Sequence, residues 1–373
     1  MKTIVPRKNR SITSIAAAML IVAFAVGSGN AEAAENKCDV MRNITFGAPT
    51  ATISIGQYPL VVALANGYFK EECINLTIQG IDGSARAAQL TAVGKVDLGS
   101  STSETFLQLN QEQGTPLVWF YQELRQPTSK IAMLADSPIK DFKDLRGKAL
   151  GASSLGSANI PFYKAALNKV GIAPNEVNYV AVGVGTVALE ALRKGHVQGL
   201  ILWDSVYAAM ERAQGASLRY LQPPGAESLF STSYFARPET IRSDPKLIAG
   251  FGRAVTKGHV FTKANPAAAI QIVWKKYPQT RIPGQSEEQQ LPTDTYALGR
   301  YIEFFTFGDV DKKKRWGQFE PALVDEWVKF AHSGGIISKL LDPQKLYTNS
   351  FVGQFNDFDQ QAIVTQARNW KKE

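Results

Sequence analysis

The sequence predicts an α/β protein with two units of mostly parallel β-sheet flanked by helices. From Arg42 onward, short apolar segments of strand length alternate with polar loops and amphipathic segments of helix length. The same rhythm starts again at Ala149, after a connector that begins at Ser137-Pro138. Parallel strands need crossover connections, so strands that alternate with helices indicate parallel sheets.

The first unit is expected from residue 42 to about residue 136. Its apolar runs predict strands, and the periodic segments that end at glycines predict helices. The expected strands span residues 42–47, 76–79, 96–98, 117–121 and 130–135, and the expected helices span 58–69, 85–93 and 104–113.

The second unit repeats this pattern. Strands are expected at residues 149–152, 177–182 and 197–202, and helices at 158–170, 186–194 and 205–213. After Tyr234 the pattern becomes helical, with helices expected at 245–264, 266–276 and 320–332 that carry proline near their N-termini. Residues 280–292 are polar and are expected to form an exposed loop.

The first 33 residues have the pattern of an export signal. Lys2, Arg7, Lys8 and Arg10 precede an apolar stretch, residues 15–26, and Ala31-Glu32-Ala33 is a small-x-small cleavage site. The apolar stretch is too short to predict a membrane span. We therefore expect cleavage near Ala33 and a periplasmic protein. Because that compartment lacks ATP and NAD, capture of a small solute is favoured over cofactor chemistry.

The charge of the chain excludes few classes of partner but argues against nucleic acid. The formal net charge is +8, and the densest basic run is Lys312-Lys313-Lys314-Arg315. So short a run is typical of a solvated loop rather than of a nucleic-acid patch. A mildly basic protein still attracts small anions.

Two cysteines, Cys38 and Cys73, precede the first two expected strands. Neighbouring parallel strands start at the same edge of a sheet, and an isolated pair in an oxidising compartment favours a disulfide. The alternative is two free thiols, one of them a nucleophile.

Polar and glycine-rich loops follow the expected strands at one edge of each sheet. Ligands of open α/β sheets bind there, where helix N-termini present unpaired N–H groups. We expect a cleft for a small anion. The alternative is that each hydroxyl only caps its own helix. The candidate binding residues in these loops are Ser54, Gln57, Ser84, Ser101, Thr102, Ser154, Ser157 and Thr186.

Aromatic residues at the ends of the expected strands offer apolar walls for the same cleft. Tyr121 and Trp203 at strand ends, and Tyr234 at a crossing between the two units, are candidates, although a single aromatic residue is more often part of the core. Arg125 follows the strand that ends at Tyr121 and has the fork geometry to hold a carboxylate or sulfonate, although it fits a surface arginine equally well.

Catalytic and metal sites have little support in the sequence. The three histidines, His196, His259 and His332, are scattered, and no metal-ligand spacing or Cys-x-x-Cys occurs. The segment 183–188 matches a dinucleotide fingerprint, with Asp204 as its distant acid, but this motif alone is weak support. We expect no cofactor, no metal and no catalytic residue.

The chain after the signal segment resembles substrate-binding proteins of ABC importers in the nitrate, sulfonate, taurine and thiamine-pyrimidine group. The motifs that carry this resemblance lie at residues 67–69, 83–85, 92–97, 137–148, 191–199, 203–204 and 327–336. Gln198 and Ser205 depart from the group's usual Asp and Pro, which leaves the identity of the solute open.

The resemblance implies a type II periplasmic-binding-protein fold, in which two lobes are joined by a hinge of two chain crossings. Lobe 1 would comprise residues 42–136 and 232–373, and lobe 2 residues 137–231. The pocket would use Ser84, Ser101, Ser157, Thr186 and the pair Trp203-Asp204.

The function expected from these observations is capture of a small organic anion, of the sulfonate or aromatic carboxylate class, and its delivery to an inner-membrane ABC permease. The protein is expected to be a monomer and not an enzyme. The alternatives are a binding protein for nitrate or a thiamine-precursor pyrimidine, and an exported enzyme that acts on a small heterocycle.

Overall fold

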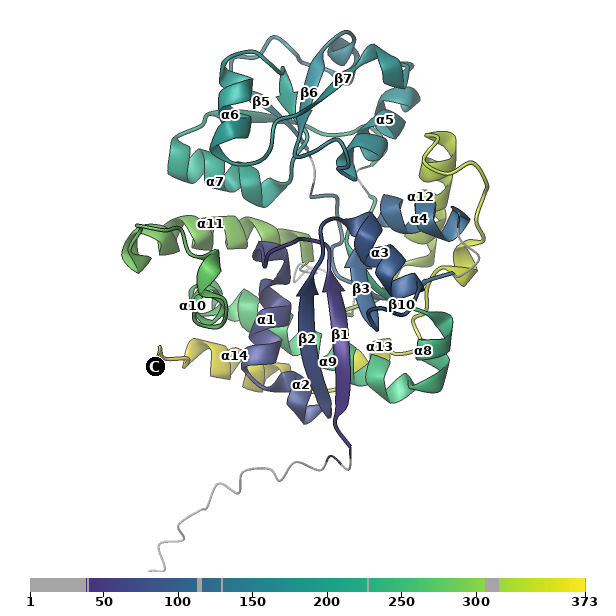
Figure 1. The fold of residues 1–373 in the computed structure, drawn as a ribbon, viewed down its shortest axis with the longest axis vertical. Coiled ribbons are helices and arrows are strands. Elements are labelled where there is room, and N and C mark those ends of the chain that lie inside the picture. The colour runs from purple at the N-terminus through teal and green to yellow at the C-terminus, as the bar shows by residue number, and fades with distance from the viewer. Residues whose placement is uncertain are drawn as a thin grey trace, which may run out of the picture. The chain divides into compact units, whose positions relative to one another are not determined.

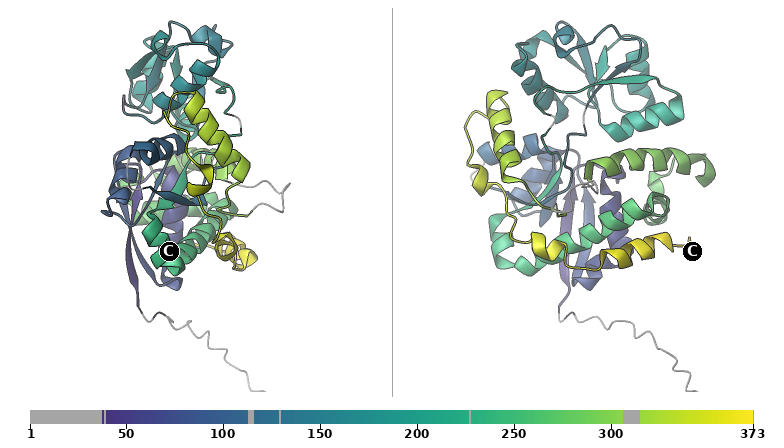
Figure 2. Two further views of the ribbon diagram at one scale, coloured as in Figure 1. Left: turned by 90° about the vertical axis from the view of Figure 1, so that its right-hand side faces the viewer. Right: turned by 180° about the vertical axis from the view of Figure 1, so that it is seen from behind.

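The computed structural model describes residues 38, 40–112, 116–128, 130–226, 228–305 and 315–372. The expected signal peptide, with its cleavage site at Ala33, and Lys312 to Lys314 lie outside these residues. Residues 38–373 form one compact unit. Within it the fold is the expected one, with two five-stranded sheets flanked by helices (Figures 1 and 2).

The first sheet has the strand order β2-β1-β3-β10-β4. Its strands are β1 (Arg42–Ala48), β2 (Ile74–Gly80), β3 (Leu98–Ser101), β4 (Val118–Gln122) and β10 (Ser233–Ala236). The helices of this part include α1 (Tyr58–Ala65), α2 (Tyr68–Glu71), α3 (Ser84–Ala92), α4 (Ser103–Glu112), α8 (Pro238–Ser243), α9 (Pro245–Ala264) and α10 (Pro266–Lys276).

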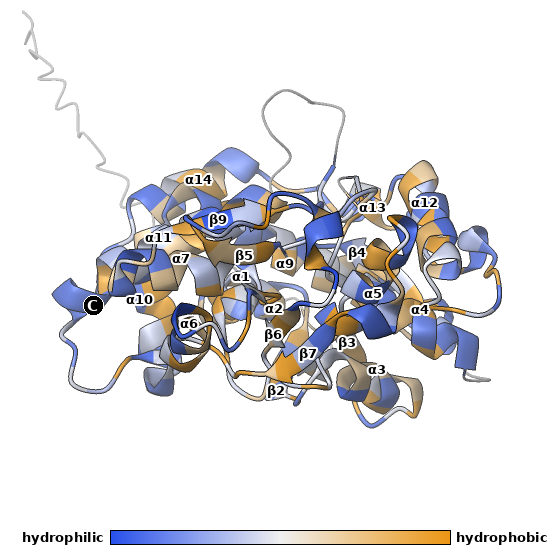
Figure 3. Ribbon diagram, turned by 90° about the horizontal axis from the view of Figure 1, so that it is seen from above, coloured by the Kyte–Doolittle hydropathy of each residue, from blue (hydrophilic) through white to orange (hydrophobic). Residues whose placement is uncertain are grey.

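The second sheet has the strand order β7-β6-β8-β5-β9. Its strands are β5 (Ile131–Leu134), β6 (Ala149–Ala152), β7 (Asn178–Ala181), β8 (Gly199–Leu200) and β9 (Leu218–Leu221), and its helices are α5 (Asn159–Lys169), α6 (Thr186–Arg193) and α7 (Asp204–Gln214). The C-terminal part adds α11 (Glu287–Phe305), α12 (Pro321–Ser333), α13 (Val352–Phe355) and α14 (Gln360–Arg368). Hydrophobic and hydrophilic residues alternate along the helices, as amphipathic packing requires (Figure 3).

The chain crosses between the sheets twice, after β4 and after β9. The strand that follows each crossing, β5 or β10, runs antiparallel to both of its neighbours. This direction has a simple cause. The chain leaves one sheet at the carboxyl ends of its strands and enters the other sheet at the equivalent edge, so the next strand must run away from that edge.

The first crossing lies earlier than the expected boundary after Asp136. The strand expected at 130–135 exists as β5, but it pairs with β8 and β9 of the second sheet. The apolar pattern of this strand identifies it as a strand but carries no information about which sheet it joins.

The expectation of a loop over residues 280–292 is wrong for its C-terminal part, because α11 begins at Glu287 and continues through Pro292 to Phe305. Pro292 lies in the second turn, where its missing N–H removes the intrahelical bond to the carbonyl of Glu288. Sequence reasoning also missed β9, β10, α13 and α14.

The long C-terminal helices start where the sequence provides a cap followed by proline. Asp244 accepts a hydrogen bond from the backbone N–H of Leu247 at the start of α9, and Asn265 does the same for Ala268 at the start of α10. The next residue in both cases is proline, which suits the first helical position.

The expected disulfide joins Cys38 to Cys73, with 5.5 Å between the Cα atoms. Residues 42–48 pair in parallel with residues 74–80, which brings both cysteines to the same end of the sheet. No cysteine is free, so the alternative of a thiol nucleophile is wrong.

Removal of this disulfide is expected to destabilise the protein substantially. It closes a loop with a sequence separation of 35 residues. Loop-closure entropy for that length corresponds to about 4 kcal/mol of unfolding free energy. Urea unfolding of the protein with and without reductant measures the effect. A Cys38→Ala/Cys73→Ala variant is the control and should not respond to reductant, and an equal response of both proteins would contradict the expectation.

Candidate functional site

A cavity of about 910 Å³ lies where the carboxyl ends of strands from both sheets face each other. Its wall contains residues that follow β1, β2, β3 and β4 of the first sheet, and others that follow β6, β7 and β8 of the second. This is the place at which ligands bind in open α/β sheets. A cavity of this volume fits a small organic molecule.

Seven of the predicted binding residues line this cavity. They come from loops of both sheets and are Ser54, Gln57, Ser84, Thr102, Ser154, Ser157 and Trp203. Gly183 and Val184, from the loop after β7, lie in the same wall. Loops that lie up to 150 residues apart in the sequence therefore meet at one cavity. The sequence analysis grouped these loops because it predicted which end of each strand carries the polar loop.

The other six predicted residues are not among the described residues of the wall. Ser101 is fully buried at the end of β3, and Thr186 is exposed at the start of α6. Arg125 lies beside α11, where its backbone N–H donates to Phe304. Tyr121, Asp204 and Tyr234 are buried within the protein instead.

Tyr121 and Tyr234 stack on each other with their ring centroids 5.5 Å apart, and they face α9. Tyr121 shares a hydrogen bond of 3.0 Å with Thr256 of that helix. The sequence analysis placed Tyr121 on a strand, now β4, but did not predict β10, the strand that carries Tyr234. Side chains alternate between the two faces of a strand, however, and these two belong to the face that packs on the helix.

The helices that start at the cavity leave N–H groups without a side-chain cap. The N-cap residues of α3, α5 and α6 are Gly83, Ala158 and Gly185, and none of them makes a side-chain cap. Ser84 and Thr186 are the first helical residues and not the caps, which argues against the interpretation that these two hydroxyls only cap helices. Ser157 differs, because its hydroxyl accepts a 3.4 Å hydrogen bond from the backbone N–H of Asn159 at the start of α5. The free N–H groups carry the partial positive charge of a helix N-terminus.

Aromatic side chains form an apolar part of the wall. Phe162, Phe230, Tyr301 and Trp327 join the predicted Trp203 there. The Trp327 indole donates a 2.6 Å hydrogen bond to the backbone carbonyl of Phe230, which satisfies its only polar atom. A wall of this composition suits a flat, partly apolar solute.

Carboxyl groups in the wall were missed by the sequence analysis. Glu104, in the first turn of α4, is 4% exposed, and Glu123, directly after β4, is also 4% exposed. Both line the cavity. An acidic residue directly after a buried strand was the signal that could have identified Glu123, since such a residue lies at the ligand edge of the sheet.

Burial raises the pKa of the Glu104 carboxyl from its ordinary value of 4.5 to about 7, and a hydrogen bond from Thr102 offsets only part of that rise. Glu104 can therefore both accept and donate a proton near neutral pH. Glu123 has close partners: the Tyr234 hydroxyl donates to Oε1 at 2.9 Å, and His259 Nε2 lies 3.7 Å from the same oxygen.

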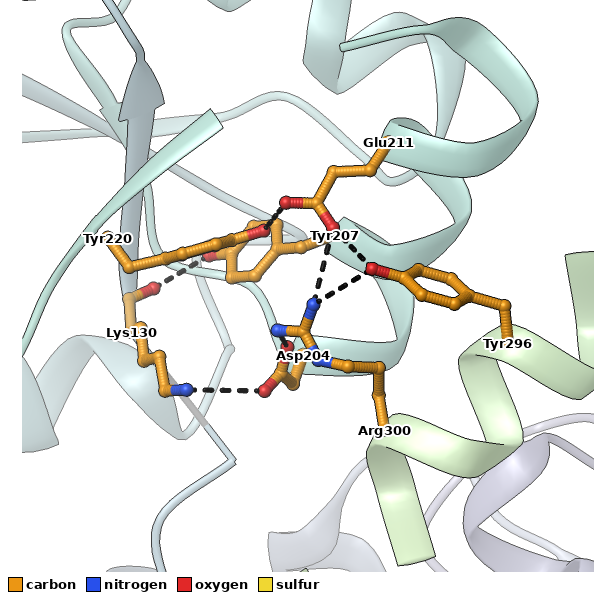
Figure 4. A network of polar contacts seen from close by, with 7 residues as sticks. All are labelled: Lys130, Asp204, Tyr207, Glu211, Tyr220, Tyr296 and Arg300. Atoms are coloured by element: carbon orange, nitrogen blue, oxygen red, sulfur yellow. Dashed lines mark hydrogen bonds and ion pairs between the residues drawn. The ribbon is translucent and has the colours of Figure 1, made fainter. Parts of the chain in front are cut away.

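Asp204 belongs to a network of polar contacts between α7 and α11 (Figure 4). Arg300 of α11 pairs with Asp204 and, at 3.3 Å, with Glu211, while Lys130 Nζ lies 3.4 Å from Asp204. Burial raises the pKa of Asp204, and the two cations offset this only in part. The carboxylate that the dinucleotide fingerprint would use is thus engaged by protein cations.

No helix among the described residues combines the length and hydropathy needed to cross a membrane. In the same part of the chain, no three His, Cys, Asp or Glu side chains gather as they would around a metal ion.

The family described as NMT1/THI5 like matches residues 55–269, which is more than half of the chain. This chain belongs to the NMT1/THI5-like family.

Solved structures of periplasmic binding proteins share the fold. The aliphatic sulphonate binding protein SsuA of Escherichia coli is 17% identical with a TM-score of 0.61, covering 82% of this chain and 92% of that one. The alkanesulfonate-binding protein SsuA of Xanthomonas axonopodis pv. citri, bound to MOPS, is 14% identical with a TM-score of 0.61, covering 83% and 100%.

Relatives of this NMT1/THI5-like protein have names of two kinds. A 4-amino-5-hydroxymethyl-2-methylpyrimidine phosphate synthase of Legionella pneumophila is 22% identical, covering 79% of this chain and 87% of the relative. The riboflavin-binding protein RibY of Chloroflexus aurantiacus is 25% identical, covering 79% and 82%. A formylaminopyrimidine-binding protein of Halalkalibacterium halodurans is 24% identical, covering 65% and 76%.

Proposed function

We propose that this NMT1/THI5-like protein is a periplasmic solute-binding protein that captures a small nitrogen heterocycle in the cavity and delivers it to an ABC permease. It acts as a monomer, transforms nothing and binds no nucleic acid. The observation that carries the class of solute is the pair of buried carboxyl groups, Glu104 and Glu123, in the cavity wall. Ring N–H and amino groups are the donors that such carboxyls accept from.

Charge in the wall favours a heterocycle over an organic anion. Among the described lining residues, Asp82, Glu104 and Glu123 are acidic and Arg86 is basic. Like charges 4 Å apart repel by about 4 kcal/mol at an effective dielectric constant near 20. A helix N-terminus typically contributes less than about 1 kcal/mol of attraction. The repulsion from an ionised carboxylate therefore outweighs the attraction of one helix terminus.

Several aromatic rings support the same class of solute. Phe162, Trp203, Phe230, Tyr301 and Trp327 can contact the faces or edges of a flat ring. The relatives named for riboflavin and formylaminopyrimidine fit this chemistry, as does the relative named for a pyrimidine phosphate.

An organic anion, such as a sulfonate or aromatic carboxylate, is the second candidate. The uncapped N-termini of α3, α5 and α6 favour it, and a protonated Glu104 would donate to it. A synthase activity is the third candidate, because several relatives have that name.

A thermal-shift experiment separates the candidates. The probes are 4-amino-5-hydroxymethyl-2-methylpyrimidine, riboflavin and ethanesulfonate, a sulfonate without a ring, each tested at pH 7.5. A ligand at 100 times its dissociation constant adds about 2.7 kcal/mol of stability. We expect stabilisation by a heterocycle and none by ethanesulfonate, and loss of the shift in a Trp203→Ala variant. Stabilisation by ethanesulfonate alone would reject the heterocycle, and a changed mass of the bound probe would reject a pure binding role.

A further inference from the structure

We infer that Glu123 is the residue of the cavity that recognises an N–H group of the solute, and that His259 is a positioning residue that keeps Glu123 ionised by holding a proton on both ring nitrogens. This inference deepens the proposed function and rests on it for the class of solute. The proton on His259 can be tested without any solute.

Glu123 has one oxygen occupied and one without a partner. The Tyr234 hydroxyl donates to Oε1 at 2.9 Å, and His259 Nε2 lies 3.7 Å from that same atom. Among the described residues, no hydrogen bond reaches Oε2. Because Glu123 lies in the cavity wall, this second oxygen is the one that remains for a solute.

The backbone of α9 determines where one proton of His259 lies. Its Nδ1 is 2.9 Å from the carbonyl oxygen of Val255, one turn earlier in the helix. A carbonyl only accepts hydrogen bonds, so Nδ1 must carry a proton. Nε2 is the other ring nitrogen, and it has no hydrogen-bond partner among the described residues.

The state of Nε2 follows from what faces it. Beside an ionised Glu123, a bare lone pair at Nε2 would lie 3.7 Å from the carboxylate oxygen in a fully buried place, which would leave two acceptors opposed and the carboxylate charge unpaired. A proton on Nε2 turns this contact into an ion pair. The Tyr234 hydrogen bond favours the ionised carboxylate, since a hydroxyl donates more strongly to it than to a carboxylic acid.

The groups around the pair do not compete for this proton. The phenols of Tyr121, Tyr234 and Tyr301 face the pair, and burial raises the pKa of each, so all three stay neutral donors. The rings of Phe305 and Trp316 pack on His259, with centroids 4.7 Å and 5.7 Å from the imidazole. Among the described residues, His259 is therefore the basic side chain within 4 Å of the Glu123 carboxylate.

The consequence is selectivity for a donor. The His259–Glu123 pair is neutral overall, but it presents an acceptor oxygen to the cavity. A ring N–H or amino group satisfies this oxygen, whereas a sulfonate or carboxylate placed there would leave it unpaired and repelled. Removal of one acceptor of a charge-assisted hydrogen bond typically weakens binding by about tenfold or more.

Nitrogen NMR of the full-length protein tests the proton on His259 without a solute. The chain has three histidines, so a His259→Gln variant assigns the signals. At pH 7 we expect protons on both nitrogens of His259, and on Nδ1 alone in Glu123→Gln. A bare Nε2 in the unsubstituted protein at pH 7 would overturn the inference.

Calorimetry with 4-amino-5-hydroxymethyl-2-methylpyrimidine tests recognition. We expect the dissociation constant to rise at least about tenfold in Glu123→Gln, and less in Tyr234→Phe, which retains the carboxylate. The control is His332→Gln, a change of an exposed side chain of α12, and it should leave the dissociation constant unchanged. His259→Gln should weaken binding and change the heat difference between phosphate and Tris buffers.

The two proposals fail in different ways. Binding of the probe with the same affinity in Glu123→Gln and the unsubstituted protein would reject the role of Glu123 while the heterocycle class stands. No binding by the unsubstituted protein would reject the class, and with it the role of Glu123, whatever NMR shows for His259.

Discussion

Replacement of Arg300 by methionine is expected to lower the free energy of unfolding by about 3 kcal/mol at pH 7. Arg300 pairs with both Asp204 and Glu211 of α7, and the Asp204 side chain is only 2% exposed. Methionine keeps most of the apolar stem but leaves Asp204 with Lys130, at 3.4 Å, as its remaining ion-pair partner among the described residues. A buried carboxylate that loses its main partner must stay charged at a cost or take up a proton.

Urea unfolding at several pH values measures this effect. The difference in unfolding free energy between Arg300→Met and the unsubstituted protein should shrink as the pH falls toward 4, because a protonated Asp204 no longer needs a cation. A second change, Asp204→Asn, should restore part of the stability of Arg300→Met, which a double-mutant cycle quantifies. The control is Lys329→Met on α12, whose pair with Asp325 is exposed and is worth less than about 1 kcal/mol. Equal losses in both variants would contradict the expected role of burial.

Glu104→Gln is expected to make the protein more stable than the unsubstituted chain at pH 8 and equally stable at pH 4. Burial raises the pKa of Glu104 in the folded protein to about 7, against 4.5 ordinarily. Between these values the folded state holds a proton that the unfolded chain has released, so stability falls as the pH rises. Each unit of pKa difference is worth about 1.4 kcal/mol, which gives a loss of about 3 kcal/mol that is complete above pH 7.

Denaturant unfolding from pH 4 to pH 8 measures how the free energy of unfolding falls as the pH rises. In Glu104→Gln this fall should be smaller by the loss of about 3 kcal/mol that the buried carboxyl causes. The matched control is Glu112→Gln at the exposed end of the same helix, α4, which should reproduce the slope of the unsubstituted protein. Parallel curves for the protein and Glu104→Gln would show that Glu104 keeps its ordinary acidity.

The sequence was informative where local pattern carries the structure. It predicted the strands that became β1, β4 and β7, the helices α9 and α10 with their Asp-Pro and Asn-Pro starts, and the disulfide at the beginnings of two neighbouring strands. It missed α11 because Pro292 and a polar first turn hide the apolar side of that helix, whose buried residues lie mostly after Tyr296.

In the candidate site, too, the sequence was informative about local pattern and not about contacts between distant segments. Hydroxyls and glycines at the ends of strands identified Ser84, Ser157 and their loops, because the carboxyl edge of a parallel sheet is fixed by strand direction. The sequence could not separate Trp203, which lines the cavity, from its neighbour Asp204, which turns toward Arg300 almost a hundred residues later.

The sequence by itself determined the succession of strands and helices, the polar loops at one edge of each sheet and the pairing of Cys38 with Cys73. All of these depend on neighbours along the chain or on adjacent strands. Only the tertiary structure decided which sheet β5 joins, that α11 packs on α7, and that Glu104 and Glu123 are buried beside one cavity. These features depend on burial and charge pairing between distant segments, and burial is what converts an ordinary carboxyl into a proton-sensitive or donor-selective group.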